Sequence, residues 1–382
     1  MNGLIGELST LQSEMIKIVS SLSEDEFCKQ YHPDLSPVGW HLGHCIYTES
    51  YWIREQLLEH EPLDEKLHSL YVPEMSNKDK RGKALPEKKK LINWAQYMQQ
   101  ENKELLGNKV NSSTSHHLLD DDFLFHFLIQ HYAQHLETIK MVQTGIRLSK
   151  KNIPNESIIF LEPQKPQQNT VTIHAEYYQI GSKNKHNPYD NEHPVHKVKL
   201  DSFNISVSPV SNAEFLTFID NAGYSRKELW SDAGWKWLSS NKITHPYHWR
   251  FEKGWYGINH EGVFTLAPEQ PIYGLSYFEA NAYAKWARAR LPHEYEWETA
   301  CQKNYLEKTF LVWEWCNNTF HPYPGFTAYP YEGYSSPYFD NNHYVLKGGS
   351  CYTKAAIKRS SFRNYYTADK RHIFAGMRLI NL

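Results

Sequence analysis

The sequence predicts a multidomain α+β protein in which a helical bundle precedes a region of short strands and loops. The chain has 382 residues, more than one ordinary domain contains. Apolar side chains recur at helical spacing through residues 1–150, whereas short alternating runs dominate after residue 168. Helices that precede strands are typical of an α+β fold or of separate domains. We expect domains at 1–150 and 169–382, joined by a polar linker at 151–168 that contains three prolines.

The composition excludes several classes of protein. With 41 basic and 43 acidic residues the formal charge is −2, so no nucleic-acid-binding surface is expected. The five cysteines form no C-x-x-C pair, which favours a reducing compartment over a disulfide framework. The N-terminus lacks the features of a signal peptide, and no segment has the run of about 18 apolar residues that a membrane helix needs. We therefore expect a cytoplasmic protein without a membrane partner.

Four helices are expected in the first 150 residues, where apolar side chains recur every three or four positions. They are Leu4–Leu22, Trp40–Leu57, Leu91–Leu106 and Phe123–Leu148. A polar loop, His68–Pro86, is expected between the second and the third. A bundle of four helices is a common frame for a metal site, because side chains on facing helices meet in its core.

Short elements are expected in the second domain. Val195–Leu200 and Phe203–Val207 alternate as strands do, and Asn212–Asn221 and Tyr277–Arg290 have helical patterns. The high aromatic content of 14% favours a loop-rich fold in which large rings pack the core.

Two histidines at helical spacing are the strongest sign of chemistry. His131 and His135 are four residues apart, so they lie on one face of the predicted last helix of the bundle. A third imidazole is available from His41 or His44, and Glu137 is placed to orient a ligand. Three histidines with open positions suit hydrolytic zinc and oxygen-activating iron alike, so the spacing leaves the metal open.

Larger motifs carry a resemblance to a known family. The segment 36–44, SPVGWHLGH, with the later H-x-x-x-H-x-E resembles a DinB-type four-helix domain. LPHEYEWE at 291–298, KGGS at 347–350 and FAGMRL at 374–379 resemble the formylglycine-generating-enzyme/sulfatase-modifying-factor fold, which is similar to C-type lectins. In this order the two domains resemble the ergothioneine-type (EgtB-like) sulfoxide synthases over nearly the whole chain.

The resemblance implies a reaction and a set of residues. In that family Fe(2+) held by three histidines activates O2, and a thiol sulfur is joined to the imidazole ring of hercynine as a sulfoxide. Carried over, the iron ligands are His44, His131 and His135, with the family pattern W-x-x-x-H favouring His44 over His41. Gln134, Asn364 and Tyr365 are implied as contacts of the hercynine-like acceptor.

The thiol donor departs from the best-known family pattern. Enzymes that use γ-glutamylcysteine have an acid and an arginine where this chain has Tyr366 and Lys370. Loss of the acid favours free cysteine or another small thiol or selenium donor. Arg81 is a candidate clamp for the donor carboxylate, since a guanidinium binds carboxylates in a bidentate fork.

The family also requires a tyrosine near the iron, and Tyr329 and Tyr71 are the two candidates. The remaining alternatives are a selenoneine- or ovothiol-type synthase, a DinB-like zinc-dependent thiol transferase or hydrolase, and a binding protein without turnover.

Overall fold

The computed structural model divides by its internal contacts into two units, residues 1–151 with 354–357 and residues 152–353 with 358–382. The residues that the structure describes are 2–111, 116–150, 160–166, 169–184 and 188–382. Most of the expected linker at 151–168 lies outside these residues. Its described part packs in the second unit, where the amide of Gln164 donates to the carbonyl of Ala213 at 3.0 Å.

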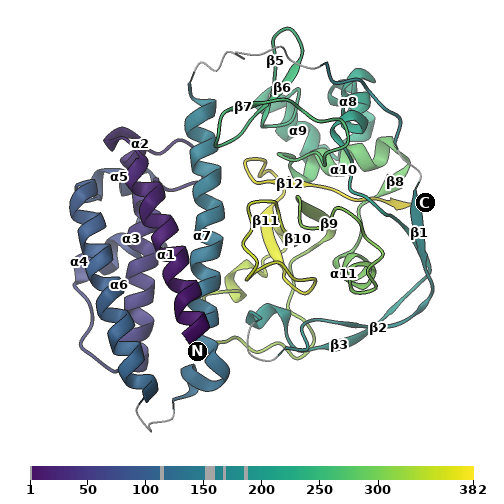
Figure 1. Ribbon diagram of the computed structural model, residues 1–382. Coiled ribbons are helices and arrows are strands. Elements are labelled where there is room, and N and C mark those ends of the chain that lie inside the picture. The colour runs from purple at the N-terminus through teal and green to yellow at the C-terminus, as the bar shows by residue number, and fades with distance from the viewer. Residues whose placement is uncertain (1, 112–115, 151–159, 167–168, 185–187) are drawn as a thin grey trace. The chain divides into compact units, whose positions relative to one another are not determined.

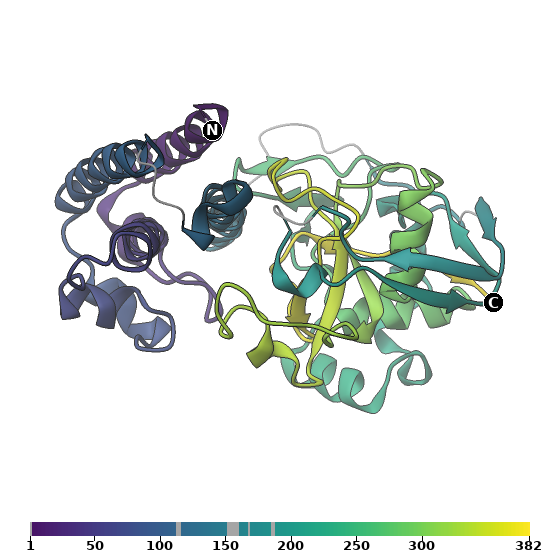
Figure 2. The same ribbon diagram turned by 90° about the horizontal axis from the view of Figure 1, so that it is seen from below.

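The first unit is a bundle of long helices that lie side by side (Figures 1 and 2). They are α1 (Asn2–Ser21), α3 (Val38–Ser50), α6 (Lys88–Asn111) and α7 (Phe123–Leu148). Helix α3 contacts α6 and α7, and α1 contacts the same two helices. A π-helical turn, Tyr51–Leu57, continues α3 and buries Trp52, Ile53 and Leu57. All four helices predicted from the apolar spacing are therefore confirmed.

The expected loop at His68–Pro86 is wrong in part, because it contains helical segments. Helix α4 spans Glu65–Tyr71 and α5 spans Lys78–Ala84, while a further short helix, α2, spans Glu24–Cys28. The Asp64 side chain caps α4 by accepting from the amide of Lys66 at 2.7 Å. Helices this short are marginal alone, so tertiary contacts decide whether they form.

Small sheets make up the second unit. In one, strands run in the order β1-β4-β13-β8, and in another β11-β10-β9-β12. A pair, β2-β3, and a meander, β5-β6-β7, complete the described sheets. The strands are β1 (Thr170–Ile173), β2 (Glu176–Ile180), β3 (His196–Leu200), β4 (Phe203–Ser206), β5 (Trp249–Phe251), β6 (Trp255–Ile258), β7 (Val263–Phe264), β8 (Ala289–Arg290), β9 (Trp313–Thr319), β10 (His343–Gly348), β11 (Asn364–Thr367), β12 (Ala375–Gly376) and β13 (Ile380–Asn381).

Three helices of the second unit begin with the same capping arrangement. Each is preceded by a side chain that accepts from an amide of the first helical turn, while a glutamate at the third helical position accepts from the cap amide. They are α8 (Asn212–Asp220), α10 (Tyr277–Trp286) and α11 (Glu294–Gln302). The first and second were predicted, whereas α11 and α9 (Asp232–Asn241) were not.

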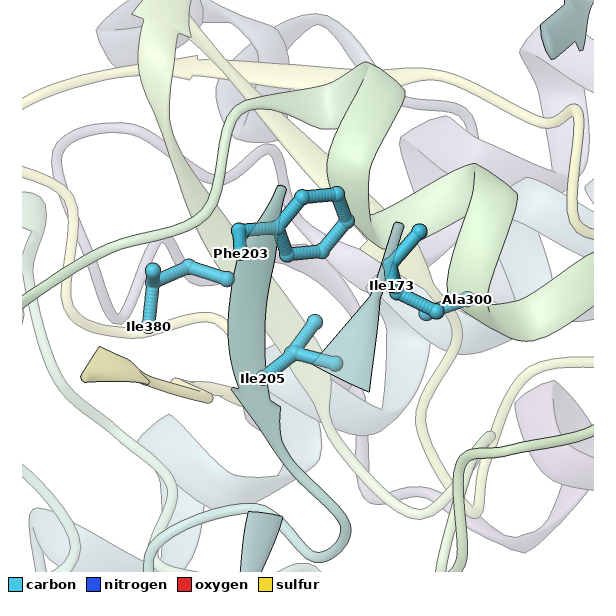
Figure 3. Packing of buried hydrophobic residues seen from close by; sticks show 5 residues of the cluster. All are labelled: Ile173, Phe203, Ile205, Ala300 and Ile380. Atoms are coloured by element: carbon cyan, nitrogen blue, oxygen red, sulfur yellow. The ribbon is translucent and has the colours of Figure 1, made fainter. Parts of the chain in front are cut away.

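Apolar side chains from distant parts of the sequence form the core of the second unit. Figure 3 shows Ile173, Phe203, Ile205, Ala300 and Ile380 packed together, which ties α11 to the sheet around β4. Within the described part of the chain, no helix combines the length and the apolar character that crossing a bilayer requires.

Candidate metal centre

Helices α3 and α7 bring three imidazoles together in the first unit. One ring nitrogen from each of His44, His131 and His135 lies within 4.8 Å of the other two. Nε2 of His44 and Nε2 of His131 are 3.1 Å apart. The i, i+4 spacing on α7 brings the rings of His131 and His135 to 4.6 Å between centroids, with their planes tilted by 59°. The cluster therefore comes from one helical turn of α7 facing one residue of α3.

The carbonyl of Tyr71 fixes the orientation of His44. This oxygen lies 2.7 Å from Nδ1 of His44. A carbonyl only accepts, so Nδ1 must carry the proton and the lone pair must be on Nε2. Nε2 is the nitrogen that faces His131. An N–H bond to a backbone carbonyl is the usual way in which a protein orients a histidine that binds a metal.

His41, the alternative first ligand, has a different position. Its Nδ1 lies 2.9 Å from Nδ1 of His135. It therefore contacts the ring nitrogen of a neighbour, whereas His44 completes the group of three. The structure thus places His41 beside the cluster, where it can accept the Nδ1 proton of His135 and leave Nε2 with a lone pair.

Burial holds these imidazoles neutral. It lowers the pKa of His44 to about 4, although the bond to the Tyr71 carbonyl acts in the opposite direction. Burial also lowers the pKa of His41 to about 3, and moves the pKa values of His131 and His135 well below 6.5. Neutral histidine is the form that binds metals.

The donor set fits a transition-metal ion. Two nitrogens bound at about 2.1 Å to one ion lie about 3.0 to 3.4 Å apart at the angles of octahedral or tetrahedral sites. The 3.1 Å between Nε2 of His44 and Nε2 of His131 falls within this range. Nδ1 of His131 is buried and has no hydrogen-bond partner among the described residues. Imidazole donors of this kind suit iron, zinc, copper and nickel.

Tyr71 and Arg81 are both buried beside this centre. The ring of Tyr71 packs on Gly43, where any side chain would overlap it. Burial raises the pKa of the Tyr71 hydroxyl and lowers the pKa of the Arg81 guanidinium to about 10. The guanidinium donates to Ser36 and Ser76 side chains and to the carbonyls of Pro73 and Ser76. These bonds involve Nε, Nη1 and Nη2 and use four of the five N–H groups. Arg81 therefore has no pair of N–H groups left to bind a carboxylate through both of its oxygens.

Strand β11 in the second unit carries three of the predicted substrate contacts. Side chains alternate between the faces of a strand, so Asn364 and Tyr366 share one face and Tyr365 lies on the other. The Tyr365 ring stacks on Phe320 at 4.3 Å, and its hydroxyl donates to the carbonyl of Tyr334 at 2.9 Å. The Tyr365 side chain therefore packs against the protein on the face of β11 opposite to Asn364 and Tyr366.

Lys370 and Tyr329 occupy loops of the second unit. The Lys370 ammonium lies 3.0 Å from the Asp369 carboxylate. The Tyr329 side chain is 39% exposed, and its amide donates to Asp190 at 3.4 Å. In the first unit, Gln134 is half-buried on α7 and lies three residues after His131. The i, i+3 spacing places Gln134 next to His131 on the surface of the helix.

Sequence comparisons agree with this division into a helical and a mixed part. The DinB superfamily matches residues 7–139, and the sulfatase-modifying factor enzyme 1-like domain matches residues 157–312 and 311–382. The chain is 30% identical to a hercynine oxygenase of Mycolicibacterium thermoresistibile, covering 98% of this chain and 94% of that protein. It belongs to the hercynine oxygenase family.

Two further relatives extend the comparison. Hercynine oxygenase of Mycobacterium tuberculosis is 28% identical, with 97% of both chains covered. Ergothioneine biosynthesis protein 1 of Schizosaccharomyces pombe is 27% identical over 50% of this chain and 27% of that protein. The fold expected from the motifs, a DinB-like bundle followed by a domain of the formylglycine-generating-enzyme type, is confirmed.

Two features of this member of the hercynine oxygenase family were not predicted from its sequence. The Tyr71 carbonyl orients His44, and the Arg81 guanidinium lies over the ring of Trp40. A main-chain carbonyl leaves no mark in the sequence. The W-x-x-x-H spacing was a usable signal for Trp40, since residues four apart on a helix are neighbours.

Proposed function

We propose that this chain is a non-haem Fe(2+), O2-dependent sulfoxide synthase. It joins a small thiol, cysteine rather than γ-glutamylcysteine, to the imidazole ring of hercynine in ergothioneine-type biosynthesis. The observation that carries the proposal is the cluster of His44, His131 and His135, in a chain that aligns over almost its full length with hercynine oxygenases.

The three histidines hold the iron in this proposal. When bound, iron supplies the activation of O2 that an oxygenase needs. The protein contributes neutral nitrogen donors, because burial keeps the pKa of His44 at about 4. The Tyr71 carbonyl accepts a hydrogen bond from Nδ1–H of His44, so the lone pair of Nε2 stays available for the metal. Three protein ligands leave further positions for small molecules.

Gln134 and Asn364 are the proposed contacts of the acceptor. Gln134 stands beside His131 on the surface of α7, which is where an acceptor next to the metal would be reached. A quaternary ammonium makes no ordinary hydrogen bond and prefers oxygen dipoles and aromatic faces. The amide oxygens of Gln134 and Asn364 supply such dipoles. Tyr365 is left out of this set because its ring and hydroxyl are used in packing.

Tyr366 and Lys370 are the proposed contacts of the donor. Tyr366 shares the face of β11 with Asn364. It replaces the acid that family members use for the ammonium of a γ-glutamyl group, which supports cysteine as the donor. We do not assign Arg81 to the donor, since its N–H groups already bind the protein.

Tyr329 is the proposed proton or hydrogen donor, and Tyr71 is the second candidate. Tyr329 is 39% exposed, whereas the Tyr71 ring is buried against Gly43. Replacing each by phenylalanine separates them. Tyr329→Phe should lower turnover at least tenfold with unchanged iron content, and Tyr71→Phe should act mainly on stability.

Anaerobic reconstitution with Fe(2+), followed by O2, hercynine and cysteine, tests the function. Mass spectrometry should detect the coupled sulfoxide, with O2 consumed in proportion. Parallel reactions with γ-glutamylcysteine and with a selenium donor identify the donor, and a selenium-containing product would point to the selenoneine-type alternative. His135→Ala should abolish product and iron binding, whereas His60→Ala, on the exposed His60, should change neither.

Zinc is the metal of the second candidate function, a DinB-like thiol transferase or hydrolase. The specific observation in its favour is that three imidazoles bind zinc as readily as iron. A protein that purifies with zinc, gives no product with Fe(2+) and O2, and transfers thiols with zinc would contradict the synthase proposal.

A further inference from the structure

Two aromatic rings of α3 stack next to the metal centre. Trp40 and His44 are four residues apart, and their rings are 4.7 Å apart with only 9° between their planes. The Arg81 guanidinium carbon lies 3.9 Å from the centroid of the Trp40 ring. Trp40 is thus in contact with both a proposed ligand and a buried cation.

The end of α4 holds both rings in place. Its last carbonyls have no partner within the helix and must find one elsewhere. The Leu70 carbonyl accepts from the indole nitrogen of Trp40 at 2.8 Å. The next carbonyl, that of Tyr71, lies 2.7 Å from Nδ1 of His44. Two consecutive carbonyls therefore bind two rings that are one helical turn apart on α3.

Arg81 in turn holds α4, α5 and the start of α3 together. It lies on α5 and is only 3% exposed. Its guanidinium donates to the hydroxyl of Ser36, which precedes α3, at 2.6 Å. It also donates to the carbonyls of Pro73 and Ser76, in the connection that follows α4, at 2.8 and 2.9 Å. These acceptors are all neutral, so the cation is retained by directional bonds and by the indole face.

We propose that Arg81 and Trp40 are positioning residues for the metal centre. Arg81 fixes the plane of the indole and the end of α4, and these fix the imidazole of His44 so that Nε2 faces His131. The inference rests on the proposed function for the identity of the metal. It assigns Arg81 a role other than substrate binding, and it explains why a lysine would not replace it, since an ammonium lacks the planar fork.

Arg81→Met and Trp40→Leu are the test variants, and Arg81→Lys is the conservative one. Loss of a group that orients a metal ligand typically costs 10- to 100-fold in metal affinity. We expect Arg81→Met and Trp40→Leu, each in the full chain, to lower the affinity for Co(2+) by this factor. Both variants should also alter the d–d spectrum of the bound Co(2+). Arg81→Lys should restore little of the affinity. Arg147→Met, at an exposed arginine, should leave affinity and spectrum unchanged.

One control variant separates a loss of stability from a loss of positioning, and one measurement on the metal-free protein tests positioning without any metal. Leu106→Ala removes a buried side chain of α6 far from the stack in sequence and should lower the melting temperature with unchanged Co(2+) affinity. The metal-free protein gives an independent readout, because the Nδ1 proton of His44 should exchange faster with solvent in Arg81→Met, as seen by NMR of labelled histidine.

The outcomes distinguish the two proposals. If the Arg81→Met protein binds Co(2+) as tightly as the wild type and keeps the slow Nδ1 proton, the positioning role is wrong, whatever the reaction is. If the wild type binds no metal at the three histidines but the Nδ1 proton of His44 exchanges faster in Arg81→Met, the proposed function is wrong and the positioning of His44 is supported.

Discussion

A buried histidine of the second unit should make the stability of the protein depend on pH. His248 is 1% exposed, and neither of its ring nitrogens has a hydrogen-bond partner among the described residues. The ring lies 5.0 Å from that of Tyr273 and 5.7 Å from that of Phe374. Burial lowers its pKa to about 3, and the positive charges of Arg371 and Arg250 act in the same direction.

The sign follows from the direction of this shift. A histidine in the unfolded chain has a pKa of about 6.5. Below that pH the unfolded state binds a proton that native His248 does not bind, so stability falls as the pH drops from about 6.5 toward 3. At pH 5.5 the unfolded histidine is about 90% protonated, which corresponds to a loss of about 1.4 kcal/mol relative to pH 7.5.

His248→Leu should remove this loss. A leucine also leaves no buried N–H without a partner, a feature that costs about 1 to 3 kcal/mol. We therefore expect the variant to match or exceed the wild type at pH 7.5, and to gain about 1.4 kcal/mol more at pH 5.5. Urea unfolding of the full chain, followed by circular dichroism at both pH values, measures the difference.

The exposed His174 provides the control, since His174→Leu should keep the pH dependence of the wild type. If His248→Leu and the wild type lose the same stability between pH 7.5 and 5.5, His248 is not the source of the pH dependence. The same conclusion follows if the imidazole of His248 titrates near pH 6.5 in NMR spectra of the folded protein.

Three further perturbations test the packing and the metal centre. Gly43→Ala would push a methyl group into the ring of Tyr71, so we expect at least 2 kcal/mol of destabilisation and weaker metal binding, with thermal melts and metal titration as the checks. Arg363→Met leaves the buried Glu294 carboxylate without the two N–H groups that now bind it at 2.7 and 2.9 Å; a loss of about 3 to 5 kcal/mol is expected, and adding Glu294→Gln should recover part of it. A chelator should lower the melting temperature of the wild type but not of His131→Ala, because only the wild type gains stability from binding; equal shifts would place the metal elsewhere.

The long helices were predictable because their signal is local. Apolar spacing placed α7 at Phe123–Leu148, the bounds that the structure has. The spacing of His131 and His135 on that helix likewise predicted that their rings would meet, and they do. Such predictions need only the geometry of one helix. They hold when the helix is long enough for the apolar spacing to repeat over several turns.

Predictions failed where a distant partner decides the structure. Arg81 stands among Lys78, Asp79 and Lys80, a run that is typical of an exposed loop, yet its guanidinium is buried. The carbonyls that bind it become visible only once α4 and α5 have formed. The strand at Asn364–Thr367 was not predicted either. Neighbouring residues of a strand face opposite sides, and nothing local showed that Asn364 and Tyr365 belong to a strand rather than to a loop.

The charge of the metal centre explains how it would attract a thiol, but not how the enzyme would choose between two thiol donors. The three proposed ligands are neutral, since burial keeps even the pKa of His44 near 4. A divalent ion that they hold therefore keeps its full charge, and such a site favours an anionic ligand and lowers the pKa of a thiol that approaches. This preference applies equally to cysteine and to γ-glutamylcysteine, because both offer the same thiol. Discrimination between them must come from groups that contact the rest of the donor. Tyr366 and Lys370 are the proposed contacts, so replacing them by an acid and an arginine should change the preference for one donor over the other.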